Sequence, residues 1–258
     1  MKFIAISAIV LLFIMGNTSC QKSKDSATPT TDSGYMYVHL HTNLDTNEAD
    51  YGTVYLASDG RRVSISLAQM LISNIDLVKA DGSLLAINGN IILKMVEQEA
   101  YMIAKVPVGS YKSIYFHVGL DSATNSKALT ASDTALSHPE MWMNNTAQSG
   151  NYVFLNFQGT VDTSSNPLGS TAPLQPFMFE IGTNAHYATV HMPNHSPVFT
   201  VTKNQSEYMH LTIDYYKLLN GVVLNNSNNL MIMNTGDNSS ATAHTIANNI
   251  PNIFSYEN

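Results

Sequence analysis

The stretch YMYVHLHTNL, residues 35–44, alternates strictly between two kinds of side chain. Successive side chains of a β-strand point to opposite faces, so this alternation predicts a strand that is buried on one side. His39 and His41 project together from the other side, within reach of one metal ion if a third ligand approaches. A solvated polar face is the competing interpretation, and a lone His-x-His pair favours it. The apolar side chains of the buried face are Met36, Val38 and Leu40.

Outward from this strand, the same period of two recurs along most of the chain. Residues 67–77 suit a helix or a strand by their apolar spacing, and their β-branched content favours a strand. Turns rich in Gly, Pro, Asn and Asp separate the runs. Many short strands spaced in this way predict an all-β fold, an antiparallel β-sandwich. The other predicted strands are residues 54–56, 63–67, 101–106, 111–119, 152–157, 177–181, 187–192, 197–201 and 208–215.

Two segments depart from the strand pattern. Residues 238–249 carry apolar side chains at helical spacing, with Ser239 or Ser240 placed to cap the first turn, and they predict a short C-terminal helix. Residues 121–134 are rich in Ser, Thr, Ala and Asn, which predicts a loop with one helical turn near Ala128.

Composition excludes several classes of function. The 258 residues are 44% hydrophobic and 12% charged, which is enough apolar material for a sizeable core. The formal net charge is -7 and the 12 basic residues form no stripe that could neutralise phosphates, so nucleic-acid binding is excluded. The sequence contains no Gly-x-Ser-x-Gly elbow, His-Glu-x-x-His motif or phosphate-binding glycine loop, and we therefore predict a non-enzymatic protein.

The N-terminus has the pattern of a bacterial lipoprotein signal. Lys2 precedes an apolar run at residues 4–15 that is too short to span a membrane, and the sole cysteine, Cys20, follows. This predicts a signal peptide at residues 1–19, lipidation of Cys20, a flexible tether at 20–33 and one folded domain at 34–258. Asn17 departs from the usual leucine of the cleavage motif, so an ordinary secretory signal is the alternative. Either way the domain is expected in the periplasm, or anchored to the outer membrane at the cell surface.

A second concentration of possible ligands lies at residues 138–145, HPEMWMNN. Trp142, the only tryptophan, stands between Met141 and Met143, with His138 four residues upstream. Cu(I) prefers thioether and imidazole ligands, so this group could form a copper pocket. The alternative, which residue types alone favour, is a plug at the end of the core, because methionine fills irregular gaps.

Six phrases in order resemble the MbnP family of secreted copper-binding proteins, and most closely its lipoprotein branch in Bacteroidetes-type bacteria. The resemblance covers residues 34–256, essentially the whole mature domain. The phrases are LISNIDLVKADGS, VPVGSYKSIYFHVGLD, EMWMNNTAQSGNYVFLNFQG, PFMFEIGTNA, HLTIDYYKLLNG and TAHTIANNIPNIF.

This resemblance implies a β-sandwich that binds copper, together with a di-haem partner related to cytochrome c peroxidases. The partner oxidises a tryptophan of the Met/Trp stretch to kynurenine at the copper site, which by motif corresponds to Trp142, with His138 nearby. The family's Phe-x-x-His-x-Gly phrase reads here with Glu180 at the histidine position. A carboxylate is a harder ligand than imidazole, so Glu180 should disfavour Cu(I) and favour Zn(II), Cu(II) or no metal. His186 could compensate if its turn folds back, although we favour a surface position for it.

We therefore predict a non-enzymatic lipoprotein that binds or acquires copper outside the cytoplasm. The predicted ligand set is His138, Trp142 and Glu180, with His39 and His41 as the second candidate. A metal-free adhesion or structural lipoprotein that keeps only the scaffold is the competing hypothesis.

Overall fold

The computed structural model describes residues 32–128, 134–145 and 152–257. The predicted signal peptide, Cys20 and most of the predicted tether lie outside the described residues. Within these ranges, no helix is long and apolar enough to cross a membrane.

Strands dominate the described residues. They are β1 (Ser33–Leu44), β2 (Asn47–Glu48), β3 (Tyr55–Leu56), β4 (Arg62–Lys79), β5 (Leu84–Ile87), β6 (Ile92–Lys94), β7 (Ala100–Pro107), β8 (Gly109–Val118), β9 (Val153–Val161), β10 (Gln175–Gly182), β11 (Ala188–His191), β12 (Phe199–Val201), β13 (Ser206–Asp214), β14 (Met231–Ile232) and β15 (Phe254–Tyr256).

Helical segments are short. The α-helices are α1 (Ser122–Asn125) and α2 (Ala241–Asn249), and the 3-10 turns are η1 (Thr134–Leu136), η2 (Pro139–Met141), η3 (Met143–Asn145), η4 (Asn184–His186), η5 (Tyr215–Leu219), η6 (Ser227–Asn229), η7 (Asp237–Ser239) and η8 (Ile250–Asn252). The helical turn expected near Ala128 is therefore α1, a few residues earlier.

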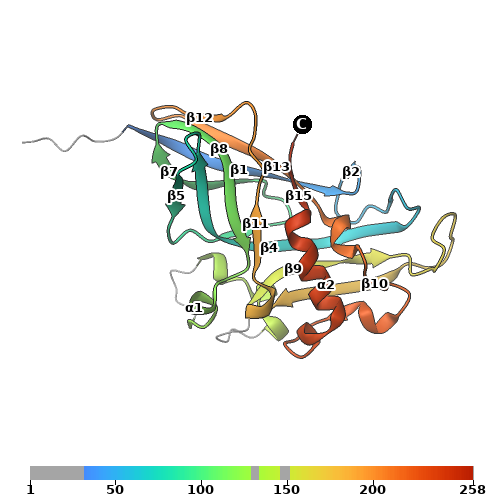
Figure 1. Cartoon of the computed structure of the whole chain (residues 1–258). Helices are drawn as coiled ribbons and strands as arrows, with labels where there is room; N and C mark the ends of the chain where they lie inside the picture. The colour runs from blue at the N-terminus through green and yellow to red at the C-terminus, as the bar shows by residue number, and fades with distance from the viewer. Residues whose placement is uncertain (1–31, 129–133, 146–151, 258) are drawn as a thin grey trace, which may run out of the picture. The chain divides into compact units, whose positions relative to one another are not determined.

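The strands form two sheets that pack into a sandwich, so the predicted all-β sandwich with a short C-terminal helix is confirmed (Figure 1). The first sheet has the order β15-β13-β1-β2, with β7 also on β1. The second has the order β11-β8-β4-β9-β10-β14, with β12 on β8 and with β3, β5 and β6 along β4. Most pairs are antiparallel as predicted, but both sheets are mixed, because β1 pairs in parallel with β13 and β10 with β14.

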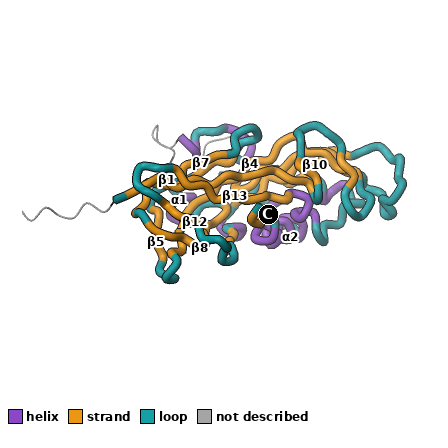
Figure 2. Tube along the Cα trace, turned by 90° about the horizontal axis from the view of Figure 1, so that it is seen from above, coloured by secondary structure: helices purple, strands orange, loops and turns teal. Residues whose placement is uncertain are grey.

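The pairing of β1 with β13 is the longest contact of the first sheet, and the two strands run side by side in Figure 2. Residues along β1 alternate between half-buried and buried over the whole strand, as the sequence predicts. Met36 and Leu40 are fully buried against the second sheet, whereas His39 and His41 are on the outer face. The core thus fixes which side of β1 faces solvent.

A second, smaller apolar cluster covers the outer face of the second sheet. It forms because β4 and β9 are buried on both faces, the outer one beneath the segment that contains η1 to η3. The helix α2 is capped at its N-terminus by Ser240, whose side chain accepts a hydrogen bond from the backbone N–H of Ala243. Its buried residues Ala243 and Ile246 join the main core, and the helix packs near β10 and η5.

Replacing Leu40 by alanine should test the face assignment of β1. Leu40 is fully buried in the main core, so Leu40→Ala should lower the free energy of unfolding by about 2 to 5 kcal/mol. His41→Ala, one position away on the outer face, should change it by about 1 kcal/mol or less. Urea melts of the metal-free proteins measure both values, and equal losses would contradict the assigned faces.

Candidate metal centre

Three histidines converge on the outer face of the first sheet. His39 and His41 come from β1, and His210 comes from β13, where the parallel register pairs it with His39. One ring nitrogen from each residue lies within 4.8 Å of the others. Among the described residues, no other group of three His, Cys, Asp or Glu side chains comes as close together. The predicted pair therefore has the third imidazole that a metal site needs.

The rings already face one another through their nitrogens. His39 Nδ1 lies 2.8 Å from His41 Nε2, and the His39 ring centroid lies 5.0 Å from that of His210. Burial, and then the neighbouring His41, lowers the pKa of His39 below its ordinary value. His39 is thus neutral at pH 7, the form that binds metal ions.

Two glutamates flank the cluster, one on each side. Glu99 Oε2 lies 3.4 Å from His39 Nε2, and its backbone carbonyl accepts a hydrogen bond from the N–H of Leu40. Glu257 Oε2 lies 3.1 Å from His41 Nε2. Both carboxylates add negative charge beside the imidazoles, which favours a bound cation.

An ion can reach the cluster from one side. A cavity of about 230 Å³ lies against it, lined by His195, Phe199, His210 and Glu257. This volume is below the range of most small-molecule sites. The cavity has room for an ion and its water, and little more.

The donor set of the cluster is imidazole and carboxylate, without sulfur. Imidazole binds both zinc and copper, and the hard carboxylate donors beside it favour Zn(II) or Cu(II) over Cu(I). The sequence singled out His39 and His41 but left His210 unassigned. Its alternation with Met209 and Leu211 does predict that His210 faces outward, yet only the parallel register brings it beside His39.

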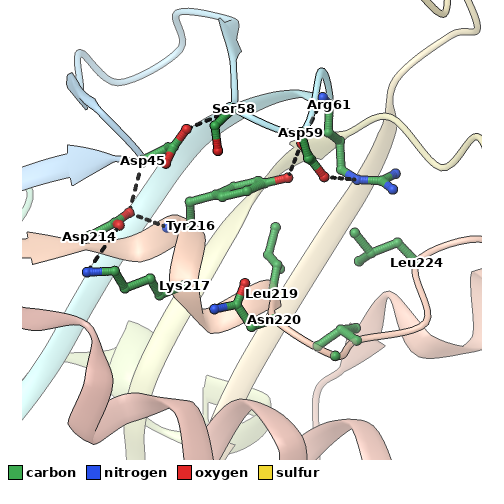
Figure 3. A pocket seen from close by; sticks show the side chains of 12 residues that line it. Asp45, Ser58, Asp59, Arg61, Asp214, Tyr216, Lys217, Leu219, Asn220 and Leu224 are labelled. Atoms are coloured by element: carbon green, nitrogen blue, oxygen red, sulfur yellow. Dashed lines mark hydrogen bonds and ion pairs between the residues drawn. The ribbon is translucent and has the colours of Figure 1, made fainter. Parts of the chain in front are cut away.

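A larger cavity, about 480 Å³, lies at the end of β1 and β13 (Figure 3). Its polar groups bind one another: Asp214 Oδ1 accepts the backbone N–H of Asp45 at 2.8 Å, and Asp45 Oδ2 accepts that of Ser58 at 2.6 Å. Across the cavity, the Tyr216 hydroxyl donates to Asp59 at 2.8 Å. These bonds tie the end of β1 to β13 and to the turn before β4, so the cavity's polar groups hold the fold in place.

Trp142 lies in the second apolar cluster. Its ring N–H donates to the backbone carbonyl of Leu136 at 2.8 Å, and the ring is half-buried. Met141 and Met143 on either side are fully buried with Phe154, which is the arrangement that the plug interpretation predicts.

The other two residues of the predicted ligand set are held by different partners. His138 immediately precedes the turn η2, and its Nδ1 atom lies 3.2 Å from Oε1 of Glu140 in that turn. Glu180, on β10, pairs with Asn156 of β9, whose side chain donates to the backbone carbonyl of Glu140 at 2.8 Å. Glu180 is thus one strand away from the turn. In the part of the chain that the structure describes, no hydrogen bond or ion pair joins any two of His138, Trp142 and Glu180.

Comparison with known proteins connects this fold to one family. The family model described as MbnP matches residues 33–234. The chain belongs to the MbnP family. MbnP from Methylosinus trichosporium superposes with a TM-score of 0.56 at 13% sequence identity, over 87% of this chain and 98% of that chain. At this identity the likeness shows the fold alone. A search of curated proteins found no match.

The MbnP phrase at residues 177–182 has a packing role that the structure makes clear. A side chain at Gly182 would collide with the Met143 side chain and the backbone carbonyl of Tyr152, so only glycine allows this close approach. The phrase therefore holds β10 against the segment that carries Trp142.

The environment of Glu180 is unfavourable to a charged ligand. Its Oε2 atom is buried and has no hydrogen-bond partner among the described residues, and burial raises the pKa of the side chain to about 7. Near neutral pH the carboxyl is therefore protonated about half of the time, and a protonated acid is a poor ligand.

His186, expected at the surface, is buried instead. Its Nδ1 lies 2.7 Å from the carbonyl of Gly182, and its Nε2 lies 3.0 Å from Nδ1 of His244 on α2. His186 fastens the turn η4 to the C-terminal helix rather than reaching Glu180.

The raised pKa of Glu180 predicts a pH-dependent stability. The folded state favours the protonated acid, so this contribution is complete below pH 4.5 and is lost as the pH rises through 7. A shift of this size corresponds to at most about 3 kcal/mol, which partial exposure reduces to about 1 to 2 kcal/mol. Glu180→Gln should therefore be more stable than wild type by about that amount at pH 8 and nearly equal to it at pH 4.5. Denaturant melts at the two pH values provide the measurement, and an equal change at both would contradict the burial argument.

Proposed function

We propose that this MbnP-family protein binds copper outside the cytoplasm, and that it holds the ion as Cu(II) between His39, His41 and His210. The observation that carries the proposal is the convergence of three imidazoles from two strands whose register the core fixes. The two flanking glutamates and the adjoining cavity support it.

Chemistry supports the choice of metal. Among divalent first-row ions, Cu(II) binds nitrogen and oxygen donors most tightly, ahead of both Ni(II) and Zn(II). The resemblance to copper-binding MbnP proteins supports copper over zinc. In this chain the three histidines, rather than the Trp142 region, offer ligands that already face one another.

We infer a binding role rather than catalysis. The cavity beside the cluster has room for an ion, but a substrate of ordinary size needs about 300 Å³ or more. A protein of this kind would acquire or store the ion and pass it on.

A metal-free adhesion role is the second candidate, and one observation favours it. Tyr37 and Tyr208 stack on the outer face of the same sheet, with ring centroids 4.9 Å apart, and Tyr208 is exposed. Exposed tyrosines offer an apolar ring with a polar tip to a glycan or protein partner. The copper experiment below separates the two functions.

Oxidation of Trp142 by a di-haem peroxidase-like partner remains a prediction from the family resemblance. The half-buried ring leaves part of the indole accessible, but the ring N–H is bound to Leu136. The mass of the peptide that contains Trp142, from protein made together with such a partner, tests this step. An unchanged mass would contradict it.

Copper titration should locate the metal. His210→Ala removes one of three ligands, so it should weaken Cu(II) binding by about tenfold or more in a competition assay. His138→Ala is the matched control, because it removes an imidazole from the other predicted site, and it should bind as wild type does. A loss in His138→Ala alone would put copper near Trp142. No copper binding by wild type would favour adhesion.

Membrane attachment should depend on Cys20. A lipidated cysteine anchors the protein, so the wild-type protein should partition into the detergent phase and Cys20→Ala into the aqueous phase. Phase separation of both proteins, expressed from the same vector, gives the comparison. Equal partitioning of the two would exclude lipidation at this position.

A further inference from the structure

The two glutamates beside the histidine cluster contact different nitrogens of the same rings. Glu99 lies 3.4 Å from His39 Nε2 and 3.9 Å from His41 Nδ1. His39 and His41 approach each other through His39 Nδ1 and His41 Nε2. Glu99 therefore contacts the other nitrogen of each ring, the one that faces away from the neighbouring histidine. Outer carboxylates of this kind orient metal-binding histidines and fix their tautomers.

Glu257, in contrast to Glu99, contacts the nitrogen of His41 that faces His39. Its Oε2 atom lies 3.1 Å from His41 Nε2, the nitrogen on the inner side, and 3.3 Å from His210 Nδ1. One carboxylate oxygen therefore lies beside two of the three clustered histidines, at the inner nitrogen of His41 and at Nδ1 of His210. Protein sites for divalent ions commonly have four ligands, and Glu257 is placed to add the fourth to three imidazoles.

Glu257 reaches the cluster because of the strand that precedes it. β15 pairs with β13 through three residue pairs, Leu211 with Tyr256 being the last, and the Glu257 N–H donates to the carbonyl of His210 at 3.1 Å. β15 is at the edge of its sheet and is only three residues long. Phe254 anchors the start of β15 in the main core, whereas Ser255 is exposed and Tyr256 is only half-buried. The end of the strand therefore opens at a lower cost, so a ligand that binds Glu257 can change how often this end is closed.

We propose that Glu257 is the fourth metal ligand, and that metal binding thereby fastens β15 to β13. This rests on the proposed function, because it requires metal at the three histidines. Glu99 is a positioning residue that holds His39 and His41 from outside. Linkage then requires that closure of β15 raises metal affinity by the same factor by which metal favours closure.

Hydrogen exchange of the metal-free and Cu(II)-loaded protein tests the coupling. In wild type, Cu(II) should slow exchange of the backbone amides at residues 254–257. Glu257→Gln should bind Cu(II) about tenfold or more weakly and, once saturated, should show no added protection there. Glu99→Gln should also bind more weakly, but it should keep the protection at saturation because the fourth ligand is present.

Glu48→Gln, an exposed substitution on β2 with the same change of charge, is the control and should behave as wild type. Wild-type affinity and protection in Glu257→Gln would overturn the proposal and leave the copper function standing. Protection that persists in saturated Glu257→Gln, or an equal loss of affinity in Glu48→Gln, would overturn it too. If wild type binds no Cu(II), the proposed function itself fails.

Discussion

The parallel pairing of β1 with β13 is the constraint on which the proposed metal centre depends. In its register His39 is opposite His210, while Leu40 is opposite Leu211 on the buried side. A slip of one residue would turn His210 into the core and expose the apolar residues of β13. Burial of each leucine side chain stabilises the fold by about 1.5 to 3 kcal/mol. A slipped register would lose this stabilisation at several positions at once. The hydrophobic core on the opposite face of the sheet therefore holds the histidines in place.

Both ends of this strand pair are fixed by polar contacts. At the start of β1, the Tyr35 N–H donates to the carbonyl of Gln205, and at its end Asp214 accepts the N–H of Asp45. Beneath β1, the fully buried Lys94 donates to Thr42 Oγ1 at 3.0 Å, and burial lowers its pKa to about 8. His39 and His41 are therefore on a stretch of β1 that is held by hydrogen bonds at both ends and on its inner side. A site with so little freedom needs little rearrangement to receive an ion.

The faces of the strands could be predicted from the sequence, because alternation is a local property. The outward position of His39 and His41 follows from the five residues around them. The plug interpretation of Met141 and Met143 came instead from residue type, and both side chains are buried. The parallel register could not be predicted, since it joins segments about 170 residues apart whose pairing depends on the whole core. The same holds for Glu99 and Glu257, which the sequence gives no reason to place beside the three histidines.

The contrast between the two candidate sites is a contrast of ligand chemistry. Around Trp142 the soft thioethers are used for packing, the histidine position of the family phrase carries a glutamic acid, and burial keeps that acid partly protonated. Little remains there that would favour Cu(I). At the first sheet, by contrast, imidazoles face one another between two exposed carboxylates, which are donors for a divalent ion. In this member of the MbnP family the scaffold is that of the family, while the imidazoles that we propose as metal ligands lie on the outer face of β1 and β13.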